Sequence, residues 1–192
     1  MSGRMVGSLV AAIFGAIFVV VNSGGLPPVA RIILCIAAVA VPAIVLVRAV
    51  LESRESREPQ GREERAYAGP TRELGRWFWP TVAIEVVALF GGLMLLNSFT
   101  SIGWAGVAWV ALVVGLHFIP FAINTKLRRF WMLTVVLSAA GAAGLILAAR
   151  GSSPDVVGIV AGVISGIALL GAALYGALRS PSHEAAPAPV AS

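Results

Sequence analysis

Charged side chains are scarce in this sequence of 192 residues. Asp, Glu, Lys and Arg make up only 12% of it, whereas water-soluble domains usually contain about 25%. Hydrophobic residues reach 58%, and the mean hydropathy is +0.92. Apolar runs of about 20 residues match the thickness of a bilayer core when they are helical. The composition therefore excludes an ordinary soluble domain and is typical of a membrane protein.

Cysteine and histidine are almost absent. Cys35 is the single cysteine, so neither a disulfide nor a cysteine-based metal site can form within one chain. Only two histidines occur, and the sequence contains no HExxH, GxSxG or Walker-type glycine motif. We therefore predict no metal, no cofactor and no catalytic residue. An intramembrane hydrolase that uses Ser138 or a lone carboxylate remains a remote alternative.

Apolar runs predict an all-α bundle of six membrane-spanning helices within residues 1–179. Residues 76–79 and 128–131 are similar in sequence at an offset of 52, which also suggests repeated helical hairpins. The spans are expected at residues 5–22, 28–47, 77–96, 102–123, 130–149 and 156–178, with a charged loop at 48–76 and a disordered tail at 180–192.

Polar residues mark two helix boundaries. Ser153 is predicted to cap the last span, with Pro154 at its first position and Asp155 favourable to its dipole. Arg48 and Glu52 are opposite charges four residues apart, a spacing that stabilises helices in water. The second helix is therefore predicted to continue beyond the membrane into the charged loop.

Basic residues are distributed unevenly between the two sides of the predicted spans. Twelve of the fourteen Lys and Arg fall on one side, and only Arg31 and Arg150 fall on the other. The positive-inside rule places the basic side, together with both termini, in the cytoplasm. The net charge of +5 thus acts as a topology signal rather than as a nucleic-acid surface. Thirteen Arg against one Lys fits a GC-rich bacterial genome, so we expect a bacterial inner membrane.

Two ionisable side chains, Glu85 and His117, lie deep inside predicted spans. At about 1.5 Å of rise per residue, Glu85 is about 12 Å and His117 about 9 Å from the same membrane face. An isolated charge is costly in hydrocarbon, so pairing is expected if their helices are neighbours. The pair is a candidate proton- or cation-binding site. The alternative is an interhelical contact that only fixes packing.

Three further residues are candidates for the same site. Ser138 lies at a similar depth in the fifth span, and Thr81 lies one turn from Glu85 on the same helix face. Pro120 has no backbone N–H, so it leaves the carbonyl of Leu116 without its usual helical partner. We expect that carbonyl to be available to a small cation or a proton donor.

Residues 115–122 read Gly-Leu-His-Phe-Ile-Pro-Phe-Ala. This stretch resembles a signature of the form GLHFxPxA in small uncharacterised bacterial multi-pass membrane proteins, and the resemblance covers eight residues. It implies a membrane helix and supplies no activity. The leading hypothesis is a small transporter-like or permeation protein. The alternative is a non-catalytic membrane protein whose cytoplasmic loop, residues 48–76, docks a partner.

Small and aromatic residues predict contacts between helices and with lipid. Gly158, Gly162 and Gly166 recur at every fourth position and form a smooth ridge. Such a ridge lets helices approach closely, either within the chain or between two copies in a homo-oligomer. Contact with the lipid interface is expected for four aromatic residues and one arginine: Trp77, Trp79, Trp104, Trp131 and Arg31.

Overall fold

The computed structural model of this chain describes residues 3–55, 71–125 and 128–178, and that part contains helices and turns but no strand. For residues 3–4, 55, 71–82, 99 and 124–125 the description covers the backbone alone. The all-α fold class is confirmed for these residues. The predicted tail at 180–192 and most of the charged loop lie outside the described residues.

The helices of the described part follow the predicted spans. In chain order they are α1 Gly3–Asn22, α2 Pro28–Glu55, α3 Thr71–Phe99, the 3-10 helix η2 Gly103–Ala105, α4 Gly106–Thr125, α5 Arg128–Ala149, α6 Pro154–Val157, the π-helix η3 Gly158–Val163 and α7 Ile164–Leu178. Five stretches are long and apolar enough to cross a membrane: α1, α2, η2 with α4, α5, and α6 to α7 taken together. The remaining predicted span, at residues 77–96, corresponds to α3, whose described apolar part, Ala83–Ser98, is shorter.

Helix boundaries differ from the predicted spans at the charged loop and in the last span. α2 continues to Glu55, which confirms its predicted extension, whereas α3 begins at Thr71 rather than at the aromatic residues near 77. Hydropathy marks where a helix becomes apolar, but backbone hydrogen bonds also form in polar segments. The loop predicted at 48–76 is correspondingly shorter. Hydropathy also gives no sign of the π-helical turn η3.

The turn between α5 and α6 is built as its residues predict. Ser153 has an extended backbone, and its side chain accepts a hydrogen bond from the Val156 N–H at 3.5 Å. Pro154 occupies the first helical position and Asp155 lies in the first turn. Before them, Gly151 has a φ of 81°, a left-handed conformation that suits glycine after a helix end. The predicted cap is therefore confirmed.

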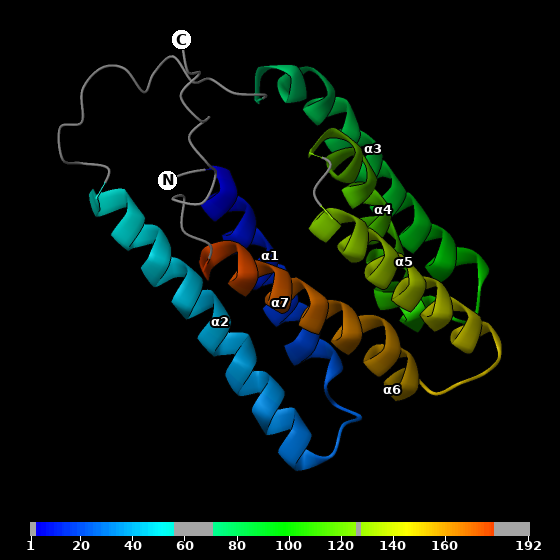
Figure 1. Cartoon of the computed structure of the whole chain (residues 1–192). Helices are drawn as coiled ribbons and strands as arrows, with labels where there is room; N and C mark the ends of the chain where they lie inside the picture. The colour runs from blue at the N-terminus through cyan, green and yellow to red at the C-terminus, as the bar shows by residue number, and fades with distance from the viewer. Residues whose placement is uncertain (1–2, 56–70, 126–127, 179–192) are drawn as a thin grey trace, which may run out of the picture.

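The helices form two groups that the last span joins (Figure 1). α1 packs most extensively with α7 and α2, while α4 packs most extensively with α5 and also holds α3. The π-helix η3 contacts α1, α4 and α5, so it lies where the two groups meet. Figure 1 also shows the start of α1 and the end of α7 at the same end of the bundle.

The predicted glycine ridge packs within the chain. Gly158, Gly162 and Gly166 are all buried, and their close neighbours are on α1. A Cβ at Gly166 would lie 2.9 Å from the carbonyl oxygen of Gly15, and one at Gly162 would meet the Asn22 side chain. The ridge thus serves packing of the last span on α1. Because all three glycines are buried, none of them is exposed for contact with a second copy of the chain. The sequence had also allowed such a contact in a homo-oligomer.

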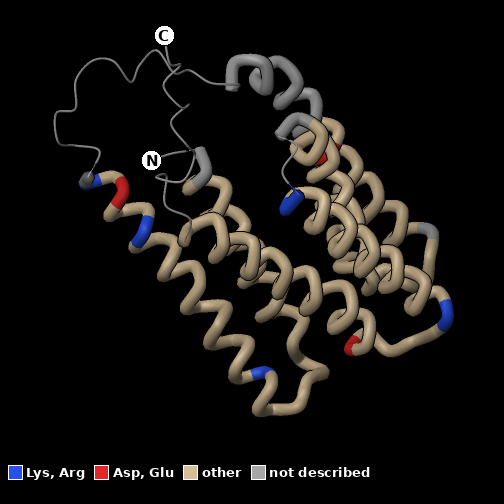
Figure 2. Tube along the Cα trace, in the orientation of Figure 1, with Lys and Arg blue, Asp and Glu red and all other residues tan. Residues whose placement is uncertain are grey.

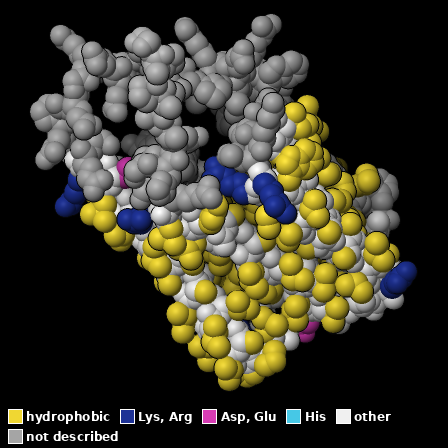
Figure 3. Space-filling model, in the orientation of Figure 1, with side chains coloured by type: hydrophobic (Ala, Val, Ile, Leu, Met, Phe, Trp, Pro, Cys, Tyr) yellow, Lys and Arg dark blue, Asp and Glu magenta, His cyan; other side chains and the backbone are white. Residues whose placement is uncertain are grey.

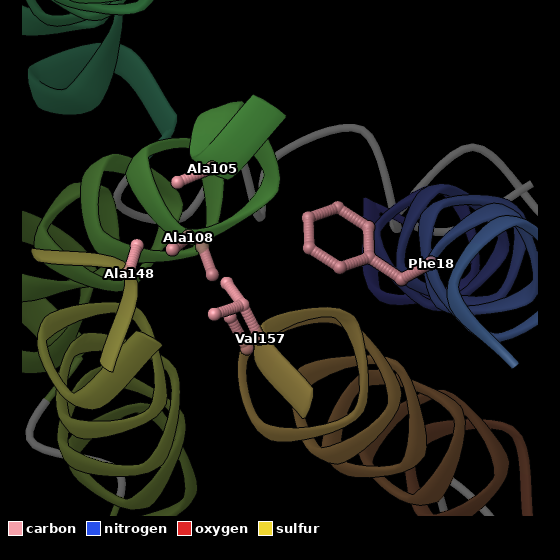
Figure 4. Close-up of a cluster of buried hydrophobic side chains, with 7 residues drawn as sticks. Phe18, Ala105, Ala108, Ala148 and Val157 are labelled. Carbon is pink, nitrogen blue, oxygen red and sulfur yellow. The ribbon is translucent and has the colours of Figure 1, made fainter. Parts of the chain in front are cut away.

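A phenylalanine of α1 reaches across to the other helix group. Phe18 is only 6% exposed, and its ring points toward Ala108 and Val157 (Figure 4). Ala105 of η2 and Ala148 of α5 belong to the same buried cluster, so Phe18 packs in a cluster that contains several alanines. Sequence reasoning did not identify Phe18, because neighbouring helices are not visible in a hydropathy profile.

We expect Phe18→Ala to lower the thermal stability of the detergent-solubilised protein. Such truncations cost about 3–5 kcal/mol in water-soluble cores. The cost here should be smaller, because helices separated within a bilayer remain in an apolar medium and only the packing term is lost. The matched control is Phe14→Ala, one turn away on the same helix, where the ring is 48% exposed. An equal loss in both variants, measured by tryptophan-fluorescence melting, would contradict a special role for Phe18.

Candidate functional site

Glu85 of α3 and His117 of α4 meet, which confirms the predicted pairing. Nδ1 of His117 lies 2.8 Å from Oε2 of Glu85. The side chains are 17% exposed for His117 and 20% exposed for Glu85, so both are largely covered. Although the distance is that of an ion pair, Nδ1 has no hydrogen bond of normal geometry within the described part. The pair is therefore a close approach of two titratable groups that a small rotation would turn into a hydrogen bond.

Trp109 of α4 holds α3 in the position that this pairing needs. Its indole Nε1 donates a hydrogen bond to the carbonyl oxygen of Ala88 at 3.0 Å. The ring lies against Gly92, where any Cβ would collide with it. Ala88 and Gly92 follow Glu85 by three and seven residues, so all three lie on one stripe of α3. The sequence analysis did not predict this contact, for which the two consecutive glycines Gly91 and Gly92 are the only signal.

Gly92→Ala is expected to displace the Trp109 ring and loosen α3 from α4. The added methyl group would overlap the indole, and overpacking of this kind costs about 1–3 kcal/mol. Gly91→Ala is the matched control, because a Cβ at Gly91 meets nothing within 4 Å. The measurement is disulfide cross-linking between cysteines placed on the facing sides of the two helices. Equal cross-linking rates in both variants would show that Trp109 does not fix this contact.

Aromatic side chains cover the imidazole on its other sides. The ring of His117 lies 5.2 Å from Phe121 and 6.1 Å from Phe118, measured between ring centroids. Phe130 of α5 contacts both phenylalanines, each at 6.1 Å. Apolar rings lower the local dielectric constant, which strengthens the electrostatic attraction between Glu85 and a protonated His117.

The other predicted site residues are placed differently. Ser138 does not join the pair: its Oγ is buried without a hydrogen-bond partner in the described part, and it lies where α5 crosses Gly115. Residues two apart on a helix point in nearly opposite directions, so Gly115 faces α5 while His117 faces α3. Pro120 lies inside α4 as predicted. The side chain of Thr81 lies outside the described part.

The surface of the bundle is apolar, as expected for contact with lipid. Figure 3 shows hydrophobic side chains over most of the described part of the visible face, and Figure 2 shows charged residues mainly at helix ends. Arg31, Trp104 and Trp131 are exposed, and their contact with the lipid interface stays a prediction. Trp77 and Trp79 lie in the first part of α3, residues 71–82, of which only the backbone is described.

No known protein guides the interpretation of this site: no family model, curated protein or solved structure matches the chain. The resemblance of residues 115–122 to the GLHFxPxA signature stays a prediction. Within the described residues, no three His, Cys, Asp or Glu side chains come together in a way that would hold a metal ion. The chemistry of the site therefore rests on the carboxylate of Glu85 and the imidazole of His117.

Proposed function

We propose that this chain is a six-span protein of a bacterial inner membrane in which Glu85 and His117 bind or relay a proton or a small cation. Five apolar stretches long enough to span, with α3 as the sixth helix, support the membrane assignment. The excess of arginine on one side of the spans supports cytoplasmic termini. An even number of spans also agrees with α1 beginning and α7 ending at the same end of the bundle (Figure 1).

The contact of 2.8 Å between Glu85 and His117 is the observation that carries the proposal. Ionisable residues inside membrane helices are rare and commonly mark ion pathways and proton relays. A carboxylate and an imidazole this close can exchange a proton once a rotation aligns them in a hydrogen bond. A carboxylate also attracts a small cation when the imidazole is neutral.

Pro120 adds a third element to the same part of α4. Because proline has no N–H, the Leu116 carbonyl, next to His117 in sequence, lacks the donor that an ordinary residue would supply. Backbone carbonyl oxygens are the usual ligands of cations that lose their water inside a channel. In this proposal the Leu116 oxygen contributes to the path of the proton or cation.

Reconstitution tests the proposal. Liposomes containing the purified protein should take up protons under an imposed potassium diffusion potential faster than protein-free liposomes, as followed with a trapped pH-sensitive dye. Sodium uptake should be measured in the same vesicles, and potassium uptake in vesicles without a potassium ionophore, to separate a proton from a small metal cation. Rates for all three ions equal to those of protein-free vesicles would overturn the proposal.

Cysteine labelling tests the proposed orientation. In a chain with Cys35→Ala, a cysteine at Ser152 should react with a membrane-impermeant maleimide in intact cells, because residue 152 lies on the arginine-poor side. A cysteine at Ser53, in the part of α2 beyond the predicted span, should react only after the cells are opened. The reverse pattern would contradict cytoplasmic termini.

A purely structural role is the second candidate, and the position of α3 favours it. The main contacts of α3 within the described part are with α4 and η2, so α3 lies at the edge of the bundle. The contact between Glu85 and His117 therefore also holds α3 against α4. In this hypothesis the charged segment 48–76 docks a cytoplasmic partner, and residues 56–70 of it lie outside the described part. Scrambling the order of residues 56–70 should abolish partner capture if docking is the role, and should leave ion flux intact if transport is.

A further inference from the structure

Arg129, the second residue of α5, has an unusual environment for an arginine at the border of an apolar surface. Its guanidinium carbon lies 5.1 Å from the centre of the Phe130 ring. Its Nε is buried and has no hydrogen-bond partner among the described residues. Arg128, immediately before it, is exposed. Two adjacent arginines therefore differ: the Arg128 side chain is exposed, and the Arg129 side chain lies against an aromatic face.

The aromatic support fixes the orientation of the Arg129 side chain. Phe130 contacts Phe118 and Phe121 of α4, so its ring belongs to a cluster of three phenylalanines rather than to a mobile surface. A guanidinium stacked on a ring keeps its positive charge and directs its N–H donors outward from its edge. The Arg129 guanidinium thus offers several N–H donors in one plane, a group that we call the donor fork.

A fork of this kind, with a buried donor left unpaired, is complementary to an oxyanion. A buried N–H without an acceptor is unfavourable, and more so when the group is charged. Phosphate oxygens fit the planar fork of arginine by accepting two parallel hydrogen bonds. The Glu85 carboxylate of α3 lies against His117.

The location indicates where the phosphate comes from. Arg129 lies at the basic end of α5, next to Arg128, and α5 is one of the helices apolar enough to span a membrane. Figure 3 shows Lys and Arg side chains along the border of the apolar surface. Lipid phosphates lie at that border, and anionic lipids attract basic residues there.

We propose that Arg129 binds the phosphate group of an anionic phospholipid at this end of the bundle. The proposal is independent of ion transport, since it concerns a different side chain and a different ligand. It also distinguishes Arg129 from Arg128, which should contribute only general electrostatic attraction.

Native mass spectrometry of the detergent-solubilised full chain tests this site, with phosphatidylglycerol as the anionic probe and phosphatidylcholine as the zwitterionic one. Arg129→Gln should lower the affinity for phosphatidylglycerol at least fivefold, whereas the matched control Arg128→Gln should change it less than twofold. Arg129→Lys keeps the charge without the fork and should give an intermediate affinity. This third variant also preserves the test if Arg129→Gln fails to fold.

The contrary outcomes are distinct. Equal losses in the two glutamine variants would overturn the proposal, because they would indicate diffuse attraction rather than a site. Unchanged binding in Arg129→Gln would overturn it as well. Inorganic phosphate is the second arm: if millimolar phosphate displaces the lipid and raises the thermal stability of the wild type but not of Arg129→Gln, the site takes a free anion and the lipid assignment is wrong.

Discussion

Glu85→Gln is expected to reduce proton or cation flux in proteoliposomes by at least tenfold while the protein remains folded. Glutamine has nearly the same shape as glutamate, so it preserves the packing of α3 on α4 and removes only the charge and the exchangeable proton. Interhelical polar contacts in membranes are worth about 0.6 kcal/mol on average, so the loss of stability should be small. Flux by dye uptake and melting in detergent are measured on the same preparations.

His117→Ala should lose flux equally and stability somewhat more, because the ring that packs against Phe118 and Phe121 is also removed. Val87→Ala serves as the control on α3, since Val87 is 72% exposed and faces away from the pair. If both pair variants keep wild-type flux and lose stability, Glu85 and His117 only fasten α3. That result would support the structural role and overturn transport.

Periodicity and hydropathy predict much of this fold because each helix carries its own signal. Apolar length predicts the long helices, and the sequence from Ser153 to Asp155 predicts where the last helical stretch begins, since capping depends on neighbouring residues alone. The common depth of Glu85 and His117 on consecutive helices was also predictable, whereas their contact depends on the faces that the two helices present to each other. The short turn after α3 makes α3 and α4 neighbours, and the rise per residue sets both side chains at one depth.

What the sequence does not predict is which distant helices touch and on which face. The glycines of the last span indicate close approach, but nothing in them identifies α1 as the partner. Nothing in the sequence assigns a partner to Trp109, and only the fold shows its ring against Gly92. Ser138 has the predicted depth and the wrong direction. Depth follows from counting along one helix, whereas direction depends on how that helix is rotated against the others.

The crossing of α1 and α7 is a second place where we expect a large effect on stability. At Gly166 an added Cβ would lie 2.9 Å from the carbonyl oxygen of Gly15 and 3.0 Å from the backbone nitrogen of Val19. Backbone atoms cannot rotate away as a side chain can, so Gly166→Ala must move one helix relative to the other. Overpacking of this type costs about 1–3 kcal/mol, and the larger value is expected where both helices are long.

Gly171→Ala, five residues later on the same helix, introduces the same methyl group where a Cβ meets nothing within 4 Å. Alanine is the better helix former by about 1 kcal/mol in water, so this variant should be neutral or slightly stabilised. The difference in melting temperature between the two variants isolates the helix crossing from helix propensity. Because α1 also carries Phe18 into the other helix group, a shift of α1 at Gly166 should also expose that ring. Gly166→Ala combined with Phe18→Ala should then cost less than the sum of the two, whereas additive losses would show that the crossing and the Phe18 cluster are independent.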